Sequence, residues 1–107
     1  MIDCIFCKIV KKQIPSTIIK ETEELLVFKD IAPRATFHYL IVPKKHIQDL
    51  SSLEPDDFYL GAKIVSMAKE LSEQSLDLRN FRLLINNGAS AGQEVFHLHA
   101  HFLAGFN

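Results

Sequence analysis

The sequence predicts an α+β fold: an antiparallel sheet of about five strands with one long and one short helix. Short apolar stretches separated by turn residues recur along the chain, as in antiparallel strands. One longer stretch between the third and fourth of them has helical periodicity. The 107 residues, 48% hydrophobic and 23% charged, fit one soluble domain over 1–107. A net charge of −1 argues against a nucleic-acid partner, and no apolar stretch is long enough to span a membrane.

The short helix is expected at the start of the chain, with Asp3 as its cap and Pro15 ending the unit. Its apolar side would consist of Ile5, Phe6, Ile9 and Val10. Three strands should follow, over residues 17–21, 25–29 and 37–43. Acidic turn residues separate the first two strands, and the loop from Asp30 to Ala35 separates the second from the third.

The long helix is expected to begin with Ser52 as its cap and Pro55 in its first turn, and to end near Ser75. Its core-facing side is predicted to be Phe58, Ala62, Val65, Ala68 and Leu71. A fourth strand over 81–86 and a polar loop over 87–92 should lead to a last strand that closes the sheet.

That last strand carries three histidines at alternating positions, His97, His99 and His101. In a strand, alternate side chains point to one face, so the imidazoles would form a row. The opposite, apolar face would consist of Phe96, Leu98, Ala100 and Phe102. Individually buried, hydrogen-bonded histidines are the simpler explanation, but three of the chain's five on one face are hard to explain that way.

Two kinds of chemistry fit such a row. Alternating histidines can bind a catalytic zinc, although a hydrolytic metal site usually includes a carboxylate base and only Glu94 lies nearby. A neutral imidazole can instead attack phosphorus while a second one assists the leaving group. The preceding loop offers amide donors for a phosphoryl group. An ordinary hairpin connection would also explain its Asn87-Gly88 pair.

Cys4 and Cys7 form a Cys-x-x-Cys pair with three possible interpretations. A redox pair is one, although no strand precedes it as in thioredoxin-like proteins. Half of a metal site is the second, because this spacing brings two thiolates to one cation. Two unrelated small hydrophobic residues are the third.

The segment His97–Leu103 matches the signature His-x-His-x-His followed by two apolar residues, and the sequence resembles the histidine triad (HIT) family. The resemblance extends over nearly the whole chain, including 4–9, 14–15, 28–33, 38–46 and 86–105. The chain is most similar to the bacterial-type branch that hydrolyses purine nucleoside phosphoramidates. This implies a hydrolase of AMP- or GMP-amine conjugates that forms a nucleotidyl-histidine intermediate. A dinucleoside polyphosphate hydrolase and a nucleotide-binding interaction module are the alternatives.

The resemblance also implies a role for each histidine of the site. His99 would be the nucleophile, oriented by the carbonyl of His97, while His101 would contact the phosphate and the leaving group. His38 would complete the network, and Asp30 would hold the ribose hydroxyls. The phosphate site would be lined by Asn86, Gly92, Gln93 and the backbone of Glu94, and the apolar slot for the base by Ile5, Phe6, Ile9, Phe28 and Ile31.

One structural zinc ion per chain follows from the same resemblance, and no catalytic metal is expected. Its ligands would be Cys4, Cys7, His46 and His97, a closed Cys₂His₂ set. Members of this branch are usually homodimers that join through the long helix and a neighbouring strand. The segment Met1–Cys4 lacks the pattern of a signal peptide, so a cytoplasmic location is expected.

Glu94 is a departure from the family, because many relatives have a serine there that contacts phosphate. A carboxylate at this position would repel an anion if it pointed inward. We therefore expect Glu94 to face away from the phosphate or to help bind a cationic leaving amine.

Overall fold

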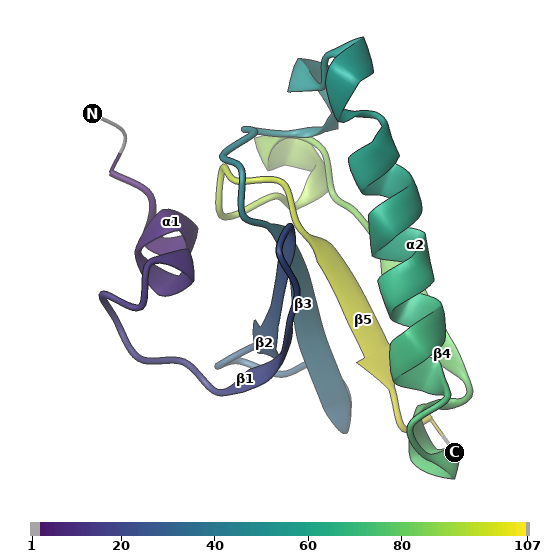
Figure 1. Ribbon diagram of the computed structural model, residues 1–107. Coiled ribbons are helices and arrows are strands. Elements are labelled where there is room, and N and C mark those ends of the chain that lie inside the picture. The colour runs from purple at the N-terminus through teal and green to yellow at the C-terminus, as the bar shows by residue number, and fades with distance from the viewer. Residues whose placement is uncertain (1–2, 107) are drawn as a thin grey trace.

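The computed structural model describes residues 3–106 and confirms the α+β fold with a five-stranded antiparallel sheet. The strands are β1 (Ile18–Glu21), β2 (Leu25–Lys29), β3 (Phe37–Pro43), β4 (Phe81–Leu84) and β5 (Ala100–Ala104). Their order in the sheet is β1-β2-β3-β5-β4 (Figure 1). The ends of the expected 1–107 domain, Met1, Ile2 and Asn107, lie outside the described residues.

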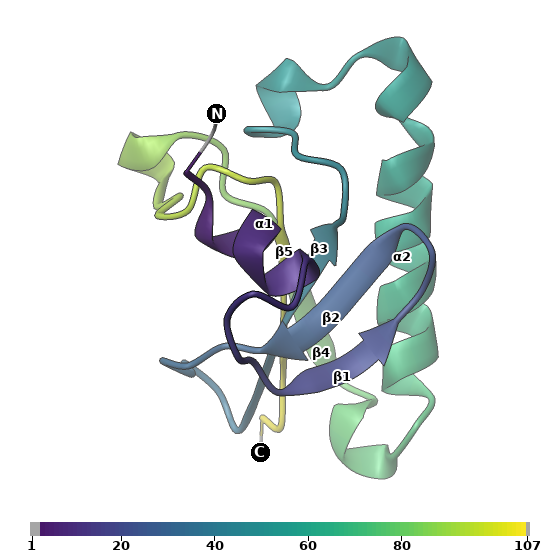
Figure 2. The same cartoon turned by 60° about the vertical axis from the view of Figure 1, so that its left-hand side comes forward.

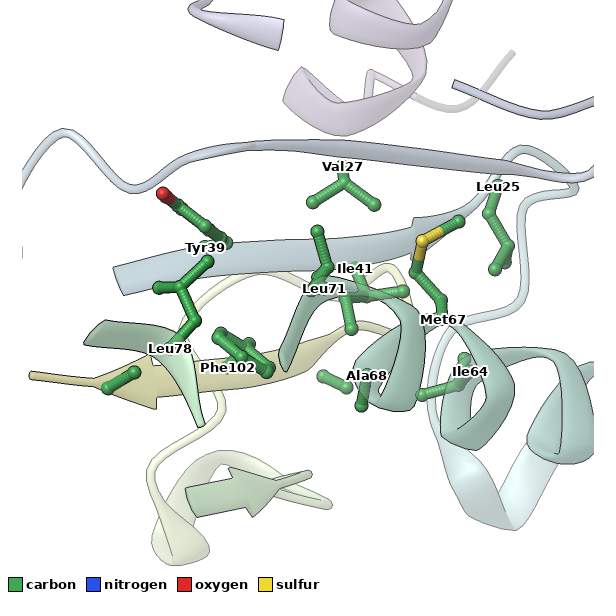
Figure 3. Packing of buried hydrophobic residues seen from close by; sticks show 12 residues of the cluster. Leu25, Val27, Tyr39, Ile41, Ile64, Met67, Ala68, Leu71, Leu78 and Phe102 are labelled. Atoms are coloured by element: carbon green, nitrogen blue, oxygen red, sulfur yellow. The ribbon is translucent and has the colours of Figure 1, made fainter. Parts of the chain in front are cut away.

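The two helices lie on opposite faces of the sheet, α2 (Tyr59–Ser72) along one and the short α1 (Ile5–Val10) on the other (Figures 1 and 2). Alternation within the strands provides a core on each face. Val27, Ile41 and Phe102 pack with α2 (Figure 3), while Leu26, Leu40 and Val42 pack with α1. Because both faces are covered, strands β2 and β3 are almost continuously apolar.

The start and the buried face of the long helix differ from the prediction. Two 3₁₀ turns, Leu50–Ser52 and Pro55–Asp57, precede α2, and the first is capped by Asp49 rather than by Ser52. The Asp49 carboxylate accepts hydrogen bonds from the backbone N–H and the hydroxyl of Ser52. The buried residues of α2 are Leu60, Ile64, Met67, Ala68 and Leu71.

The exposed residues show why the predicted face was wrong. Phe58 precedes the helix and is 60% exposed, and Val65 is 61% exposed. Ala62 is exposed as well, so only Ala68 and Leu71 of the predicted face are buried. The buried stripe also has helical spacing: Ile64 and Leu71 pack on the sheet, and Leu60 packs against Ile47 and Leu98.

The prediction for the last strand was wrong in its start and in its place. Strand β5 begins at Ala100, so His97 and His99 lie before it, and it runs between β3 and β4 inside the sheet. Pairing with β3 ends at Ile41 opposite Ala100. Upstream of this point the N–H of Leu98 donates to the carbonyl of Ile47 instead, over 2.6 Å. Phe96, predicted to be in the apolar face, is 45% exposed.

The start of α1 also differs from the prediction. Cys4, not Asp3, is the N-cap, and its Sγ accepts a hydrogen bond from the backbone N–H of Cys7 over 3.4 Å. Asp3 pairs with Lys8 at the surface. Phe6 and Ile9 are buried as predicted, whereas Ile5 is 49% exposed.

Within the described residues, none of the helices has the length and apolar character required to cross a membrane.

Candidate functional site

A pocket of about 730 Å³ opens between α1, the end of β2 and the segment that leads into β5. One wall is apolar and includes Phe6, Ile9 and Phe28, with Ile5 on the same side. The other wall carries the polar groups Asp30, Arg34, Glu94, His99 and His101. An apolar slot beside a few convergent polar groups is typical of small-molecule sites.

His99 is held in one tautomer by its own chain. Its Nδ1 lies 2.7 Å from the backbone carbonyl of His97, and a carbonyl only accepts, so Nδ1–H is the donor. The lone pair of the neutral ring is therefore on Nε2. Burial is the main cause that lowers the pKa of His99, although its hydrogen bond to His97 opposes this effect. His99 is thus a neutral imidazole with its unprotonated nitrogen free for attack, and it packs edge-on against Phe6.

His38 and His101 form a second oriented pair. The backbone N–H of Arg34 donates to Nδ1 of His38 over 3.1 Å, so His38 carries its proton on Nε2. That proton is directed at Nδ1 of His101, 2.9 Å away. His101 in its neutral form then carries its proton on Nε2 and is a hydrogen-bond donor. Because the His99 and His101 rings are 5.0 Å apart, the site combines a nucleophile with an adjacent donor.

Burial lowers the pKa of His101 to about 4, and the neighbouring His99, His38 and Arg34 add to this effect. Asp30 acts in the opposite direction. Burial also lowers the pKa of His38. The buried pair is consequently neutral at physiological pH.

This pair should make stability depend on pH. The unfolded chain takes up the His101 proton near the ordinary pKa of 6.5, and the folded protein only near 4. Stability is therefore full above 6.5 and decreases as the pH falls to about 4, by roughly 1–3 kcal/mol. Urea unfolding at several pH values would measure this loss, which should be smaller in His101→Asn. An equal loss in both proteins would contradict the assignment.

The arrangement around His38 and His101 argues against a catalytic metal at this position. Asp30, His38 and His101 bring ligand atoms within 4.8 Å of one another, and the Asp30 carboxylate lies 3.3 Å from Nε2 of His38. However, Nε2 of His38 carries a proton, because its Nδ1 already accepts from Arg34. The Arg34 guanidinium, 3.3 Å from Nδ1 of His101, would repel a cation.

Cys4, Cys7, His46 and His97 form a group that could hold a metal. Sulfur–nitrogen distances are 3.4 Å for Cys4–His97, 3.3 Å for Cys7–His46 and 3.6 Å for Cys7–His97. A tetrahedral zinc ion with ordinary bond lengths requires sulfur–nitrogen separations of about 3.5 Å. His97 donates from Nε2 to the Pro43 carbonyl over 2.7 Å, which leaves the lone pair of Nδ1 facing the cysteines. The donor set and its spacing therefore fit zinc.

The loop before His97 is held by Gln93, whose side chain is buried. Its amide nitrogen donates to the carbonyls of Gln48 and Val95, and its amide oxygen accepts from the N–H of Gly88. Gly92, with φ of +100°, lines the pocket next to the Asn86 side chain. Gln93 and Asn86, both expected at the phosphate site, are not among the residues that line this pocket.

The other predicted site residues mostly come together. The four histidines are buried, and Ile5, Phe6, Ile9, Phe28, Asp30, Ile31, Gly92 and Glu94 all line the pocket. Ile31 is 98% exposed and lies at the rim. Arg34 is a lining residue that the sequence analysis missed, because an arginine in a loop carries no signal of its own. Only the fold shows that its amide and guanidinium reach the histidine pair.

Comparison with known proteins agrees with this geometry. A family model described as HIT domain matches residues 11–107. A HIT family hydrolase from Legionella pneumophila is 42% identical, with a TM-score of 0.92, and the match covers 98% of this chain and 95% of that one. A zinc-bound histidine triad family protein from Mycobacterium smegmatis is 32% identical, with a TM-score of 0.86 and coverage of 98% and 76%. A histidine triad nucleotide-binding protein from Candida albicans is 37% identical, with a TM-score of 0.86 and the same coverages. The chain belongs to the HIT domain family.

Proposed function

We propose that the protein is a purine nucleotide-binding hydrolase that cleaves nucleoside 5′-phosphoramidates through a nucleotidyl intermediate on His99. The hydrogen bond between Nδ1 of His99 and the His97 carbonyl carries this proposal, because it makes Nε2 the nucleophilic atom in the pocket. The Legionella relative, described as a hydrolase, supports the same class of reaction.

The chemistry would proceed in two displacements. Nε2 of His99 forms a bond to phosphorus, and the bond from phosphorus to the amine nitrogen breaks. The electron pair leaves with the amine, which takes up one proton. The modified ring is positive, and its Nδ1–H stays on the His97 carbonyl, which disperses the charge. Water then attacks phosphorus and loses one proton, the electron pair returns to Nε2, and the nucleoside monophosphate departs.

The walls of the pocket suit a nucleotide. The apolar side, with Phe6 and Phe28 in edge-to-face contact, would hold the base. The Asp30 carboxylate would accept hydrogen bonds from the ribose hydroxyls, and Nε2–H of His101 would donate to a phosphoryl oxygen or the leaving group. The similarity to the histidine triad nucleotide-binding protein from Candida albicans supports this assignment.

We further propose that the cysteine–histidine group binds one structural zinc ion per chain. The four ligands close the coordination sphere, and the Mycobacterium smegmatis relative is described as zinc-bound. Zinc at this site would fix α1 and the backbone of His97 relative to each other. It would thereby position the carbonyl that orients His99. We also propose a cytoplasmic location, where cysteines are kept reduced and available as metal ligands.

A homodimer is also part of the proposal. Strand β4 is at one edge of the sheet, and the apolar side chains of Phe58, Tyr59 and Val65, at the start of α2 and within it, are exposed. A pair formed through α2 and β4 would cover this surface. Sedimentation equilibrium would distinguish a mass of two chains from a mass of one.

The proposed function is tested by a panel of substrates. Purified protein should release AMP from a fluorogenic adenosine phosphoramidate faster than it cleaves diadenosine polyphosphates. Faster cleavage of the polyphosphates would favour the alternative hydrolase. Binding of AMP without turnover of either class would indicate an interaction module.

Glu94 is expected to affect the choice of leaving amine. Its carboxylate is exposed at the pocket, so Glu94→Ser should reduce the preference for a lysyl over a neutral amine by about three- to tenfold. Relative kcat/KM values for the two amines would measure the change. Glu23→Ser, which removes an exposed carboxylate outside the pocket, is the control. Equal relative rates in wild type and Glu94→Ser would contradict the prediction.

A further inference from the structure

Arg34 contacts both members of the His38–His101 pair through two different donors. Its backbone N–H donates to Nδ1 of His38 over 3.1 Å, and its guanidinium Nη2 lies 3.3 Å from Nδ1 of His101. The side chain lines the pocket. None of the roles derived from the sequence includes this residue, yet its place in the loop before β3 brings it to the centre of the site.

We infer that Arg34 is a positioning residue that holds His101 in its neutral form with the proton on Nε2. The inference rests on the proposed function, in which that proton faces the substrate. A guanidinium has donors and no acceptor, so it can only donate to Nδ1 of His101. His38 donates to the same nitrogen over 2.9 Å. Two donors converge on this lone pair, and the proton of the neutral ring therefore remains on the other nitrogen.

The charge of Arg34 acts in the same direction. The groups that face His101 are His99 before β5, His38 on β3, and Asp30 and Arg34 in the connecting loop. After burial, which is the largest cause, His99, His38 and Arg34 lower the pKa of His101, and Asp30 raises it. Of these neighbours only Arg34 is permanently cationic. No salt bridge to Arg34 is present among residues 3–106, so no carboxylate neutralises this charge within 4 Å.

The protonated nitrogen matters because of what it faces in catalysis. Phosphoryl oxygens are acceptors, so a ring with its proton on Nε2 gives a donor–acceptor contact. The other tautomer would place a lone pair against an oxygen lone pair. Arg34 would thus act through His101, without touching the reacting atoms itself.

The experiment compares wild type, Arg34→Gln and Arg34→Lys as zinc-loaded proteins with ¹⁵N-labelled histidine. Arg79→Gln removes an equal charge from an exposed position outside the pocket and is the control. Long-range ¹H–¹⁵N spectra would report the tautomer and the protonation midpoint of His101 as the pH is lowered. Loss of one cation at this distance should raise the midpoint by about 0.5–1 pH unit in Arg34→Gln.

Arg34→Lys keeps the positive charge, so its His101 midpoint should lie close to the wild-type value. Arg79→Gln should leave the midpoint unchanged. The acid limb of kcat for an adenosine phosphoramidate should move by the same amount as the midpoint. An unchanged midpoint in Arg34→Gln would overturn the inference. In that case a higher KM would indicate that Arg34 binds the substrate directly, and a lower melting temperature alone would indicate a purely structural role. Because the titration uses the free protein, it tests the role of Arg34 even if phosphoramidates are not the substrates.

Discussion

Replacement of His99 by alanine is expected to lower kcat for an adenosine phosphoramidate by about a thousandfold or more. The substitution removes the only imidazole in the described chain whose Nδ1 is fixed by the His97 carbonyl, and with it the atom that would bond to phosphorus. Stopped-flow release of the fluorescent amine would measure the loss. The substrate should still bind, because the apolar wall and Asp30 are unchanged.

Two controls separate lost chemistry from lost structure. AMP affinity and the melting temperature of His99→Ala should remain close to those of wild type. Lys69→Ala, on the exposed side of α2, should leave kcat unchanged. Turnover that persists in His99→Ala would remove the nucleophile from the mechanism and favour a catalytic metal instead.

Removal of zinc is expected to destabilise the protein rather than to stop chemistry at once. The proposed ligands connect α1, the end of β3 and the segment before β5, so a chelator should lower the melting temperature by about 10 °C or more. Differential scanning calorimetry with and without chelator would measure this effect. Below the new melting temperature, activity should fall only in part, because the ion would position the His97 carbonyl without taking part in the chemistry.

Cys4→Ala provides the matched control for this experiment. The variant should have the low melting temperature of the chelated protein, and the chelator should lower it no further. A wild-type melting temperature that does not respond to chelation would contradict the zinc site. Prompt loss of activity that added metal restores, with no change in stability, would instead indicate a catalytic metal.

The strands were predicted best where the sheet is buried on both faces. Strands β2 and β3 have the predicted bounds, because nearly continuous apolar stretches of this length, bounded by turn residues, leave few alternatives. The last strand was predicted to start too early. Histidines and apolar residues alternate upstream of Ala100, but the pairing with β3 ends there. The face of α2 was wrong for a related reason. The two turns before it shift the start of the helix, and periodicity alone does not show which stripe meets the sheet.

The candidate site was partly predictable from side-chain chemistry. The histidine spacing indicates the pocket with His99, and the cysteine pair indicates the metal group. In the fold the two sites meet at His97. Gln93 is expected at the phosphate, and its amide hydrogen-bonds to the backbone of Gly88 and Val95 and, across the structure, of Gln48. Nothing in the sequence distinguishes these roles for an amide. Arg34 could not be predicted as a site residue, because its contacts depend entirely on the path of the loop into β3.

The central claim is that His99 forms a bond to the nucleotide, and rapid-quench mass spectrometry tests it most directly. Wild-type protein mixed with an adenosine phosphoramidate and quenched in base, where phosphohistidine survives, should show the added mass of one adenylyl group. Peptide mapping should place this group on His99, and His99→Ala should show none. An adduct on another residue, or fast turnover with no adduct at any quench time, would contradict the mechanism.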